Sequence, residues 1–185
     1  MTDPVLETER LILRRIGPGD AELQFRHLNS AEVMEHIGGI KAIEDIRARL
    51  DKAMRLFDER GFSFLFMVEK ASGELVGHCG IKLVDNPLAK NPGDMEVGWA
   101  VRPDRWRRGY AHEAMQAVLR WAFETHHAPH VVALTADRNE KSWRLMEKLG
   151  MARAPELDFD DPDYAPEDNP TILYRITRAD WEKAA

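Results

Sequence analysis

Four arginines lie close together in a chain that is otherwise acidic, with a formal net charge of −6 at pH 7. They are Arg102, Arg105, Arg107 and Arg108. Apolar residues at helical spacing predict that a helix begins directly after Gly109. Its first turn would expose unpaired N–H groups and the positive end of the helix dipole, while Gly109 and the small Ala111 let an anion approach the backbone. This spacing predicts a cradle for a diphosphate, and an arginine-rich loop that only caps a helix is the alternative.

Two strands and a helix are predicted to position this cradle. Met95–Val101 reads as a strand that ends just before the arginines, and Val131–Ala136 reads as a buried strand. The helix between them presents one apolar face, made of Ala111, Ala114, Met115, Val118, Leu119, Ala122 and Phe123. Strand, helix and strand in this order predict a parallel pair with a right-handed crossover.

The remaining apolar patterns predict further strands and two more helices, and therefore a mixed sheet. An opening strand is predicted over Leu6–Ile16, before Gly17 and Pro18. A helix from Ile43 to Phe57 is expected to stop at Gly61, and Asn139 is expected to cap a second helix that ends at Gly150. The other predicted strands are Phe62–Val68, Leu75–Leu83, Met151–Leu157 and Thr171–Thr177.

Three segments carry a resemblance to a known family. Trp106-Arg107-Arg108-Gly109-Tyr110-Ala111 is similar to the pyrophosphate loop of the GNAT acetyltransferase superfamily, which has the form Gln/Arg-x-x-Gly-x-Gly/Ala. Trp106 departs from the first position, as it often does in the RimJ/RimL-like branch of ribosomal-protein N-terminal acetyltransferases. The opening segment Leu6–Arg14 and the segment Asn139–Met151 also resemble that branch. The matches extend from residue 6 to residue 151 in the expected order.

The resemblance implies an α/β (α+β) fold with a mixed, mostly antiparallel central sheet flanked by helices. One splayed parallel strand pair would hold acetyl-CoA, with the diphosphate on the amides from Arg107 to Ala111. Asn139 would contact the pantetheine arm, and amides near Val101 would polarise the thioester carbonyl. The implied cofactor-binding residues are Val101, Arg107, Arg108, Gly109, Tyr110, Ala111, Asn139 and Ser142.

Acetyl transfer to an amine needs two proton movements, from the ammonium and to the thiolate. Many relatives use a tyrosine as the acid, but Met146 stands at that position here, so the resemblance suggests Ser142 instead. For the base we name Glu96, on the strand beside the expected thioester. A helix-surface serine and an ordinary strand-surface carboxylate remain the alternative interpretations of these two residues.

Composition limits the other functions. The 185 residues are consistent with a single domain over the whole chain, and the net negative charge argues against nucleic acid or an anionic membrane as the main partner. The N-terminal segment does not resemble a secretory signal, and no apolar run is long enough to cross a bilayer. With Cys79 as the single cysteine, a disulfide within the chain is excluded and a cytoplasmic protein is expected.

Other polar clusters have less specific interpretations. His126, His127 and His130 lack metal-ligand spacing and are expected at a helix end, and Cys79 is expected to be a buried apolar residue, so no metal site is predicted. The acidic stretch from Asp158 to Asn169 is expected to be a solvated loop, or else to border the acceptor pocket and attract cationic amines.

We therefore expect an acetyl-CoA-dependent N-acetyltransferase that acts on a peptide N-terminus or a small amine, as a monomer or homodimer. The alternative is a regulatory module of the same fold that binds acyl-CoA without turnover. A nucleotide-phosphate enzyme is disfavoured, because the sequence has neither Gly-x-x-x-x-Gly-Lys-Ser/Thr nor Gly-x-Gly-x-x-Gly.

Overall fold

A computed structural model describes residues 4–184. The chain divides into two compact units. The first contains the residues up to Gly80 together with Trp99–Val118, and the second contains Ile81–Gly98 together with the residues from Leu119 onward.

The strands of the first unit form an antiparallel series in chain order. They are β1 (Pro4–Glu7), β2 (Leu11–Arg15), β3 (Phe64–Glu69) and β4 (Leu75–Leu83), whose last residues belong to the second unit. The predicted opening strand is confirmed over Leu11–Arg15, but its extension back to Leu6 as one strand is wrong, because the chain reverses at Thr8, whose N–H donates to the carbonyl of Leu11 at 3.0 Å. The strands predicted over Phe62–Val68 and Leu75–Leu83 are confirmed as β3 and β4, which pair antiparallel.

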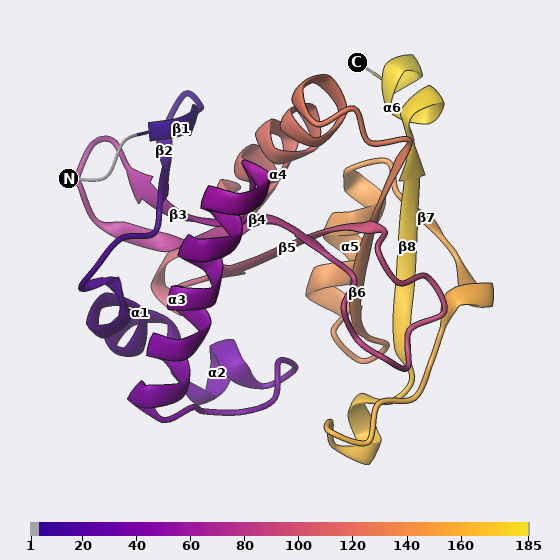
Figure 1. Cartoon of the computed structure of the whole chain (residues 1–185), viewed down its shortest axis with the longest axis horizontal. Helices are drawn as coiled ribbons and strands as arrows, with labels where there is room; N and C mark the ends of the chain where they lie inside the picture. The colour runs from indigo at the N-terminus through magenta and orange to yellow at the C-terminus, as the bar shows by residue number, and fades with distance from the viewer. Residues whose placement is uncertain (1–3, 185) are drawn as a thin grey trace. The chain divides into compact units, whose positions relative to one another are not determined.

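Helices α1 (Asp20–Leu28) and α3 (Ile43–Arg60) lie side by side and pack on this sheet (Figure 1). Ile46 and Leu50 of α3 join Phe66 of β3 in one buried cluster. The prediction of α3 and of its stop at Gly61 is confirmed, since Gly61 has a φ of 78° and donates its N–H to the carbonyl of Phe57 at 2.9 Å. The α1 helix and the short α2 (Ala31–Met34) were not predicted, because α1 buries only Ala21 and Leu28 and α2 is a single turn.

Strand β5 (Met95–Val101) and helix α4 (Tyr110–Arg120) have the predicted positions. The end of β5 comes very close to β4 within the first unit. A Cβ added to Gly77 would lie 2.1 Å from the carbonyl oxygen of Ala100, so only glycine allows this approach. The predicted apolar face of α4 is confirmed, because Ala114, Met115 and Val118 are fully buried.

The second unit has the strand order β5, β6 (His130–Ala136), β8 (Thr171–Thr177) and β7 (Ala152–Arg153). Strands β5 and β6 are parallel, with Glu96 opposite Val132, and β6 pairs antiparallel with β8 along its whole length. The predicted mixed, mostly antiparallel sheet with one parallel pair and flanking helices is therefore confirmed.

Helix α5 (Glu140–Lys148) follows β6, and α6 (Arg178–Ala184) follows β8. The prediction of a strand over Met151–Leu157 is largely wrong. Only Ala152–Arg153 pairs with β8, and Pro155–Leu157 forms a 3-10 turn, because Pro155 has no N–H to donate to a sheet.

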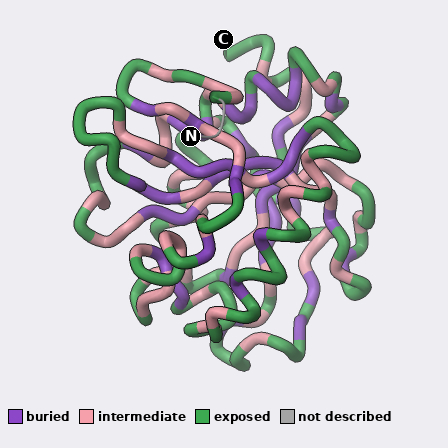
Figure 2. The backbone as a smooth tube through the Cα atoms, turned by 60° about the vertical axis from the view of Figure 1, so that its left-hand side comes forward, coloured by how far each residue is buried: buried purple, intermediate pink, exposed green. Residues whose placement is uncertain are grey.

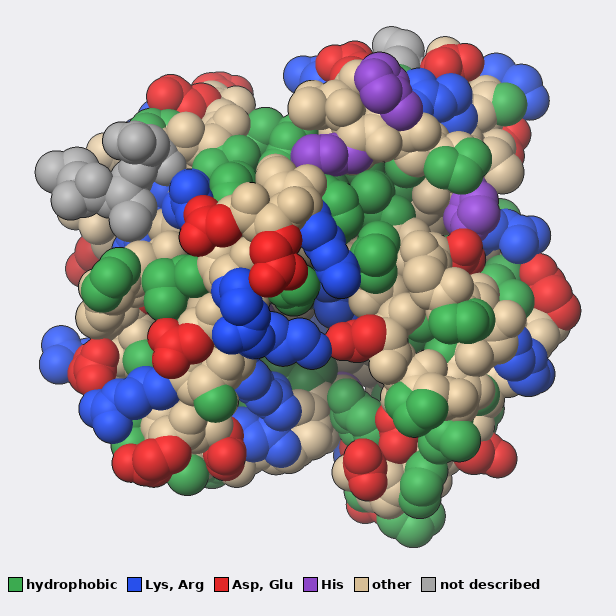
Figure 3. All heavy atoms as spheres, in the orientation of Figure 1, with side chains coloured by type: hydrophobic (Ala, Val, Ile, Leu, Met, Phe, Trp, Pro, Cys, Tyr) green, Lys and Arg blue, Asp and Glu red, His purple; other side chains and the backbone are tan. Residues whose placement is uncertain are grey.

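Buried residues run along the strands and along the inner faces of the helices (Figure 2). In the second unit they include Val84, Val132 and Leu173, which form one cluster. Figure 3 shows acidic and basic side chains interspersed on the face that carries α3, consistent with an amphipathic helix. Within residues 4–184, no helix has the length and apolar character needed to cross a membrane.

Candidate functional site

The loop between β5 and α4 has an unusual backbone. Arg107 has a φ of 60° and Gly109 a φ of 81°, so two of three consecutive residues have a left-handed backbone conformation. A non-glycine residue adopts this conformation at a cost of roughly 1–2 kcal/mol, and such strain is typical of functional sites. The N–H of Glu113 donates to the carbonyl of Gly109 at 3.0 Å, so the helix starts directly after this loop. Alternating left-handed residues before a helix can point several N–H groups toward one anion.

Two of the four arginines expected around an anion are instead bound to carboxylates. Arg102 donates to the Leu75 carbonyl at 2.9 Å and pairs with Asp104 at 3.1 Å. Arg105 pairs with Glu69 at 3.3 Å and also with Glu74. Their charge is therefore partly neutralised, because Asp104 and the turn between β3 and β4, which carries Glu74, lie beside them. They anchor the loop.

Arg107 and Arg108 are both exposed, as is Gly109. Tyr110 is buried, and its hydroxyl donates to Glu69, which raises the pKa of the phenol. Only the backbone of Tyr110 therefore remains available to a ligand at the start of α4. Ala111 is half-buried and adds no bulk to the first turn.

The indole of Trp106 holds the loop against the end of β5. Its Nε1–H donates to the carbonyl of Val101 at 2.7 Å, which ties the loop to the last residue of β5. Val101 itself is buried. The tryptophan that departs from the common family pattern is thus a structural anchor between the predicted diphosphate loop and the strand predicted to face the thioester.

In the second unit, Glu96 forms an ion pair that the sequence did not predict. The Nζ of Lys82 lies 3.1 Å from the Glu96 Oε2, and the Glu96 side chain is only 12% exposed. Burial raises the pKa of Glu96, although the Lys82 ammonium acts in the opposite direction. Burial alone would lower the pKa of Lys82, but Glu96 and Asp85 together raise it. The sequence does not indicate that Lys82 pairs with Glu96, since the two residues lie on different strands.

Asn139 and Ser142 lie together at the start of α5. The Ser142 N–H donates to the Asn139 carbonyl at 3.0 Å. The Asn139 side chain does not cap the helix as expected, because its amide donates to the Thr135 hydroxyl at 2.9 Å. Ser142 is half-buried, and Met146, one turn further along α5, is fully buried.

The acidic stretch is only partly exposed to solvent. Asp161 and Asp168 are buried, which contradicts the interpretation as a solvated loop for these two residues. Asp161 accepts a hydrogen bond from Asn86 at 2.6 Å, and Asp168 accepts one from Arg138 at 2.7 Å. Three acidic residues of the stretch are exposed, namely Asp160, Asp163 and Glu167.

The same stretch lies near the Lys82–Glu96 pair. Asn86, which holds Asp161, directly follows Asp85, whose carboxylate is 3.8 Å from the Lys82 Nζ. Tyr164 of the stretch also contributes to the raised pKa of Lys82. The exposed acidic residues therefore belong to a loop that is hydrogen-bonded beside the half-buried Glu96 carboxylate.

The histidines and the cysteine do not form a reactive site. His126 packs edge-on against Trp121, with ring centroids 4.9 Å apart, and His130 lies 3.0 Å from Asp94. Among residues 4–184, no group of three or more His, Cys, Asp and Glu side chains is arranged to hold a metal ion. Cys79 is buried, as predicted, and burial raises the pKa of its thiol, which makes it a poor nucleophile.

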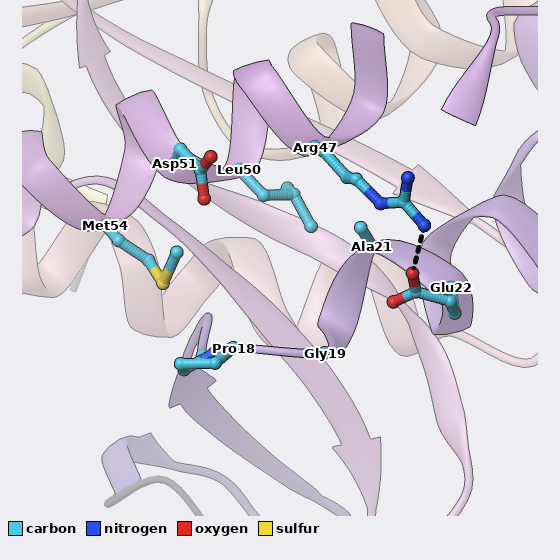
Figure 4. Close-up of a pocket in the computed structure, with 9 residues that line it drawn as sticks. Pro18, Gly19, Ala21, Glu22, Arg47, Leu50, Asp51 and Met54 are labelled. Carbon is cyan, nitrogen blue, oxygen red and sulfur yellow. Dashed lines mark hydrogen bonds and ion pairs between the residues drawn. The ribbon is translucent and has the colours of Figure 1, made fainter. Parts of the chain in front are cut away.

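A hollow of about 360 Å³ lies between α3 and the turn before α1 (Figure 4). Leu50 and Met54 line it, and Arg47 pairs with Glu22 at its edge at 2.7 Å. None of the predicted site residues lines this hollow.

A family model for the acetyltransferase (GNAT) domain matches residues 10–152, which include the loop, Glu96, Asn139 and Ser142. The chain belongs to the GNAT acetyltransferase family. It is 30% identical over 152 residues to the Bacillus subtilis (strain 168) protein named "Uncharacterized N-acetyltransferase YoaA", an alignment that covers 81% of this chain and 84% of the relative.

Two further relatives support this assignment. Over 184 residues the GNAT chain is 28% identical to the FsC-acetyl coenzyme A-N(2)-transacetylase of Aspergillus fumigatus, with 96% of this chain and 78% of the relative covered. The crystal structure of an acetyltransferase from Agrobacterium tumefaciens str. C58 superposes with a TM-score of 0.79 at 27% identity, covering 96% of each chain. The prediction of an N-acetyltransferase is confirmed at the level of the family.

Proposed function

We propose that this GNAT protein transfers an acetyl group from acetyl-CoA directly to a primary amine, either a peptide N-terminus or a small amine. The observation that carries the proposal is the loop before α4, where Arg107 and Gly109 are left-handed and both arginine side chains, Arg107 and Arg108, are exposed. Exposed N–H groups, a helix N-terminus and free positive charge suit the diphosphate of coenzyme A.

The remaining cofactor roles follow the family resemblance. The amides from Arg107 to Ala111 would bind the diphosphate, and Asn139 would contact the pantetheine arm together with Ser142. The Asn139 amide nitrogen is held by Thr135, which leaves its side-chain oxygen as the group available to a ligand N–H. Backbone amides near Val101 would stabilise negative charge on the thioester oxygen.

Glu96 is the proposed general base. The amine nitrogen attacks the thioester carbonyl, a C–N bond forms, the C–S bond breaks, and the ammonium proton must leave. An ammonium of pKa about 10 needs an acceptor for this proton. Because burial raises the pKa of Glu96, its carboxylate is a stronger base than an exposed one. The proton would reach it directly or through a water molecule.

Ser142 is the proposed acid for the leaving thiolate. The buried thioether of Met146 has no proton to donate, and the hydroxyl of Ser142 lies one turn earlier on α5. A proton passed from the Ser142 hydroxyl to the sulfur as the C–S bond breaks, and replaced on Ser142 from solvent, would neutralise the leaving thiolate.

The acceptor is proposed to be cationic. Asp160, Asp163 and Glu167 are exposed on the loop that is fastened beside Glu96. Their charge would raise the local concentration of protonated amines through long-range attraction. The segments Leu6–Arg14 and Asn139–Met151 resemble the RimJ/RimL-like branch, which favours a peptide N-terminus over a small amine.

The test is release of coenzyme A thiol, measured with a panel of N-terminal peptides and small amines. Turnover that depends on both acetyl-CoA and an amine supports the proposal. Tight binding of acetyl-CoA by calorimetry, with no thiol released above hydrolysis for any acceptor, would instead favour a regulatory module, which the missing tyrosine at Met146 permits. Absence of acetyl-CoA binding would reject both functions.

A further inference from the structure

The turn between β1 and β2 is bonded to the start of α4 through one carboxylate and one carbonyl. The Glu113 Oε1 accepts from the Thr8 hydroxyl at 2.5 Å and from the Arg10 N–H at 2.8 Å. The Arg10 Nε donates to the Glu113 Oε2 at 2.6 Å, and the Arg10 Nη1 donates to the Arg108 carbonyl at 2.9 Å. The Arg10 side chain therefore grips the diphosphate loop and the first turn of α4 at the same time.

The bond to the Arg108 carbonyl determines where the next N–H points. The carbonyl of Arg108 and the N–H of Gly109 belong to one planar trans peptide, in which they point in opposite directions. Because Arg10 holds the carbonyl, the Gly109 N–H is directed away from Arg10 and cannot rotate without breaking that bond. A Cβ on Gly109 would lie 3.3 Å from the Arg10 Nη2, so the guanidinium packs directly on this peptide.

Arg10 also balances a charge. Glu113 lies in the first turn of α4, where its carboxylate stabilises the helix but would repel a bound diphosphate. Its side chain is 18% exposed, so solvent screens it only partly. The guanidinium at 2.6 Å offsets this negative charge beside the loop.

The position of Arg10 is itself well defined. Its carbonyl accepts from the Lys70 N–H at 2.8 Å, and its guanidinium lies 4.6 Å from the centroid of the Tyr110 ring. A lysine at this site would present one charged nitrogen, and could not donate from two separate atoms to Glu113 and to Arg108 in a fixed geometry.

We propose that Arg10, supported by Thr8 and Glu113, is a positioning residue that sets the affinity of the α4 loop for the diphosphate of coenzyme A. Arg10 acts by holding the Arg108–Gly109 peptide and by neutralising Glu113. This inference rests on the proposed function, because it presumes that the loop binds acetyl-CoA.

The experiment compares two acetyl donors, one with and one without the diphosphate. Acetyl-CoA carries the diphosphate and the adenosine 3′-phosphate joined to it, and S-acetylpantetheine has the same thioester and pantetheine arm without either group. The value of kcat/KM is measured for both donors with wild-type protein, Arg10→Met, Arg10→Lys and Thr8→Val. Arg47→Met is the matched control, since it removes another partly exposed arginine–glutamate pair of the first unit, at 2.7 Å, away from the predicted site residues.

We expect Arg10→Met to lower kcat/KM for acetyl-CoA by about tenfold or more, the effect of losing charge-assisted hydrogen bonds, while S-acetylpantetheine changes by less than about twofold. Arg10→Lys and Thr8→Val should fall between Arg10→Met and wild type, and Arg47→Met should leave both donors unchanged. A general loss of stability would lower both donors equally and would overturn the inference, as would an unchanged ratio in Arg10→Met.

Wild-type protein separates this inference from the proposed function. If wild type uses acetyl-CoA no better than S-acetylpantetheine, the diphosphate is not recognised and the proposed loop site itself is wrong. If wild type strongly prefers acetyl-CoA and Arg10→Met keeps that preference, use of acetyl-CoA stands and only the role of Arg10 is rejected.

Discussion

Replacement of Gly109 by aspartate is the most direct perturbation of the proposed site. Gly109 has a φ of 81°, so any side chain at this position carries a backbone cost, roughly 1 kcal/mol for aspartate, which tolerates left-handed backbone better than most residues. For a chain of this size, that cost corresponds to a fall in Tm of about 2–4 °C. Stability should therefore change little, and the protein should stay folded.

The effect on acetyl-CoA binding should be much larger. A carboxylate roughly 6 Å from one phosphate charge, at an effective dielectric constant of about 20, costs roughly 3 kcal/mol. That energy corresponds to about a hundredfold loss of affinity. The new carboxylate would also compete with Glu113 for Arg10, whose Nη2 lies 3.3 Å from the added Cβ. We expect the Kd for acetyl-CoA, measured by calorimetry, to rise by at least this factor.

A matched variant separates charge at the loop from backbone strain. Gly93 has a φ of 86°, and a Cβ added there meets no atom within 4 Å, so Gly93→Asp adds the same charge and a similar strain elsewhere. Its acetyl-CoA Kd should equal that of wild type, with a similar fall in Tm. If Gly109→Asp is folded and binds acetyl-CoA within about threefold of wild type, our placement of the diphosphate is wrong.

Three further variants address the chemistry. Lys82→Met should move the acidic limb of the kcat/KM pH profile to higher pH, because the Lys82 ammonium lowers the pKa of Glu96 and its loss lets the carboxylate protonate sooner; a limb that stays in place would argue against Glu96 as base. Ser142→Ala should lower kcat by about a hundredfold with little change in acetyl-CoA Kd, measured by stopped-flow and calorimetry, whereas an unchanged kcat would remove Ser142 as the acid. Neutralising the exposed residues Asp160, Asp163 and Glu167 together should raise KM for a cationic acceptor at low salt but not at high salt, and a neutral acceptor tests whether the effect is electrostatic.

Structural features that depend only on residues close together in the chain could be predicted from the sequence. The apolar face of α4 and strand β5 show in local periodicity, because a helix and a strand repeat their buried positions every 3.6 and two residues. Gly61 ends α3 because glycine readily adopts the left-handed backbone conformation, a property of the residue itself. The Trp106–Ala111 segment could be recognised for the same reason, since the loop and the helix start that it precedes are consecutive in the chain.

Other errors came from turns that local patterns do not specify. The reversal at Thr8 divides the strand predicted over Leu6–Ile16 into β1 and β2. In the strand predicted over Met151–Leu157, a 3-10 turn begins at Pro155. Helix α1 was missed because few of its residues are buried, so its apolar repeat is weak.

The sequence by itself determined the family, the order of most helices and strands, and the position of the loop that we expect to bind an anion. The tertiary structure decided which charges remain available to a ligand. Arg102 and Arg105 are bound to the β3–β4 turn, Lys82 is paired with Glu96, and Arg10 reaches Glu113 across 103 positions of the chain. Electrostatic pairing depends on the distance between charges in space. Residues far apart in the chain come together only in the folded structure, and no sequence periodicity indicates which of them will pair.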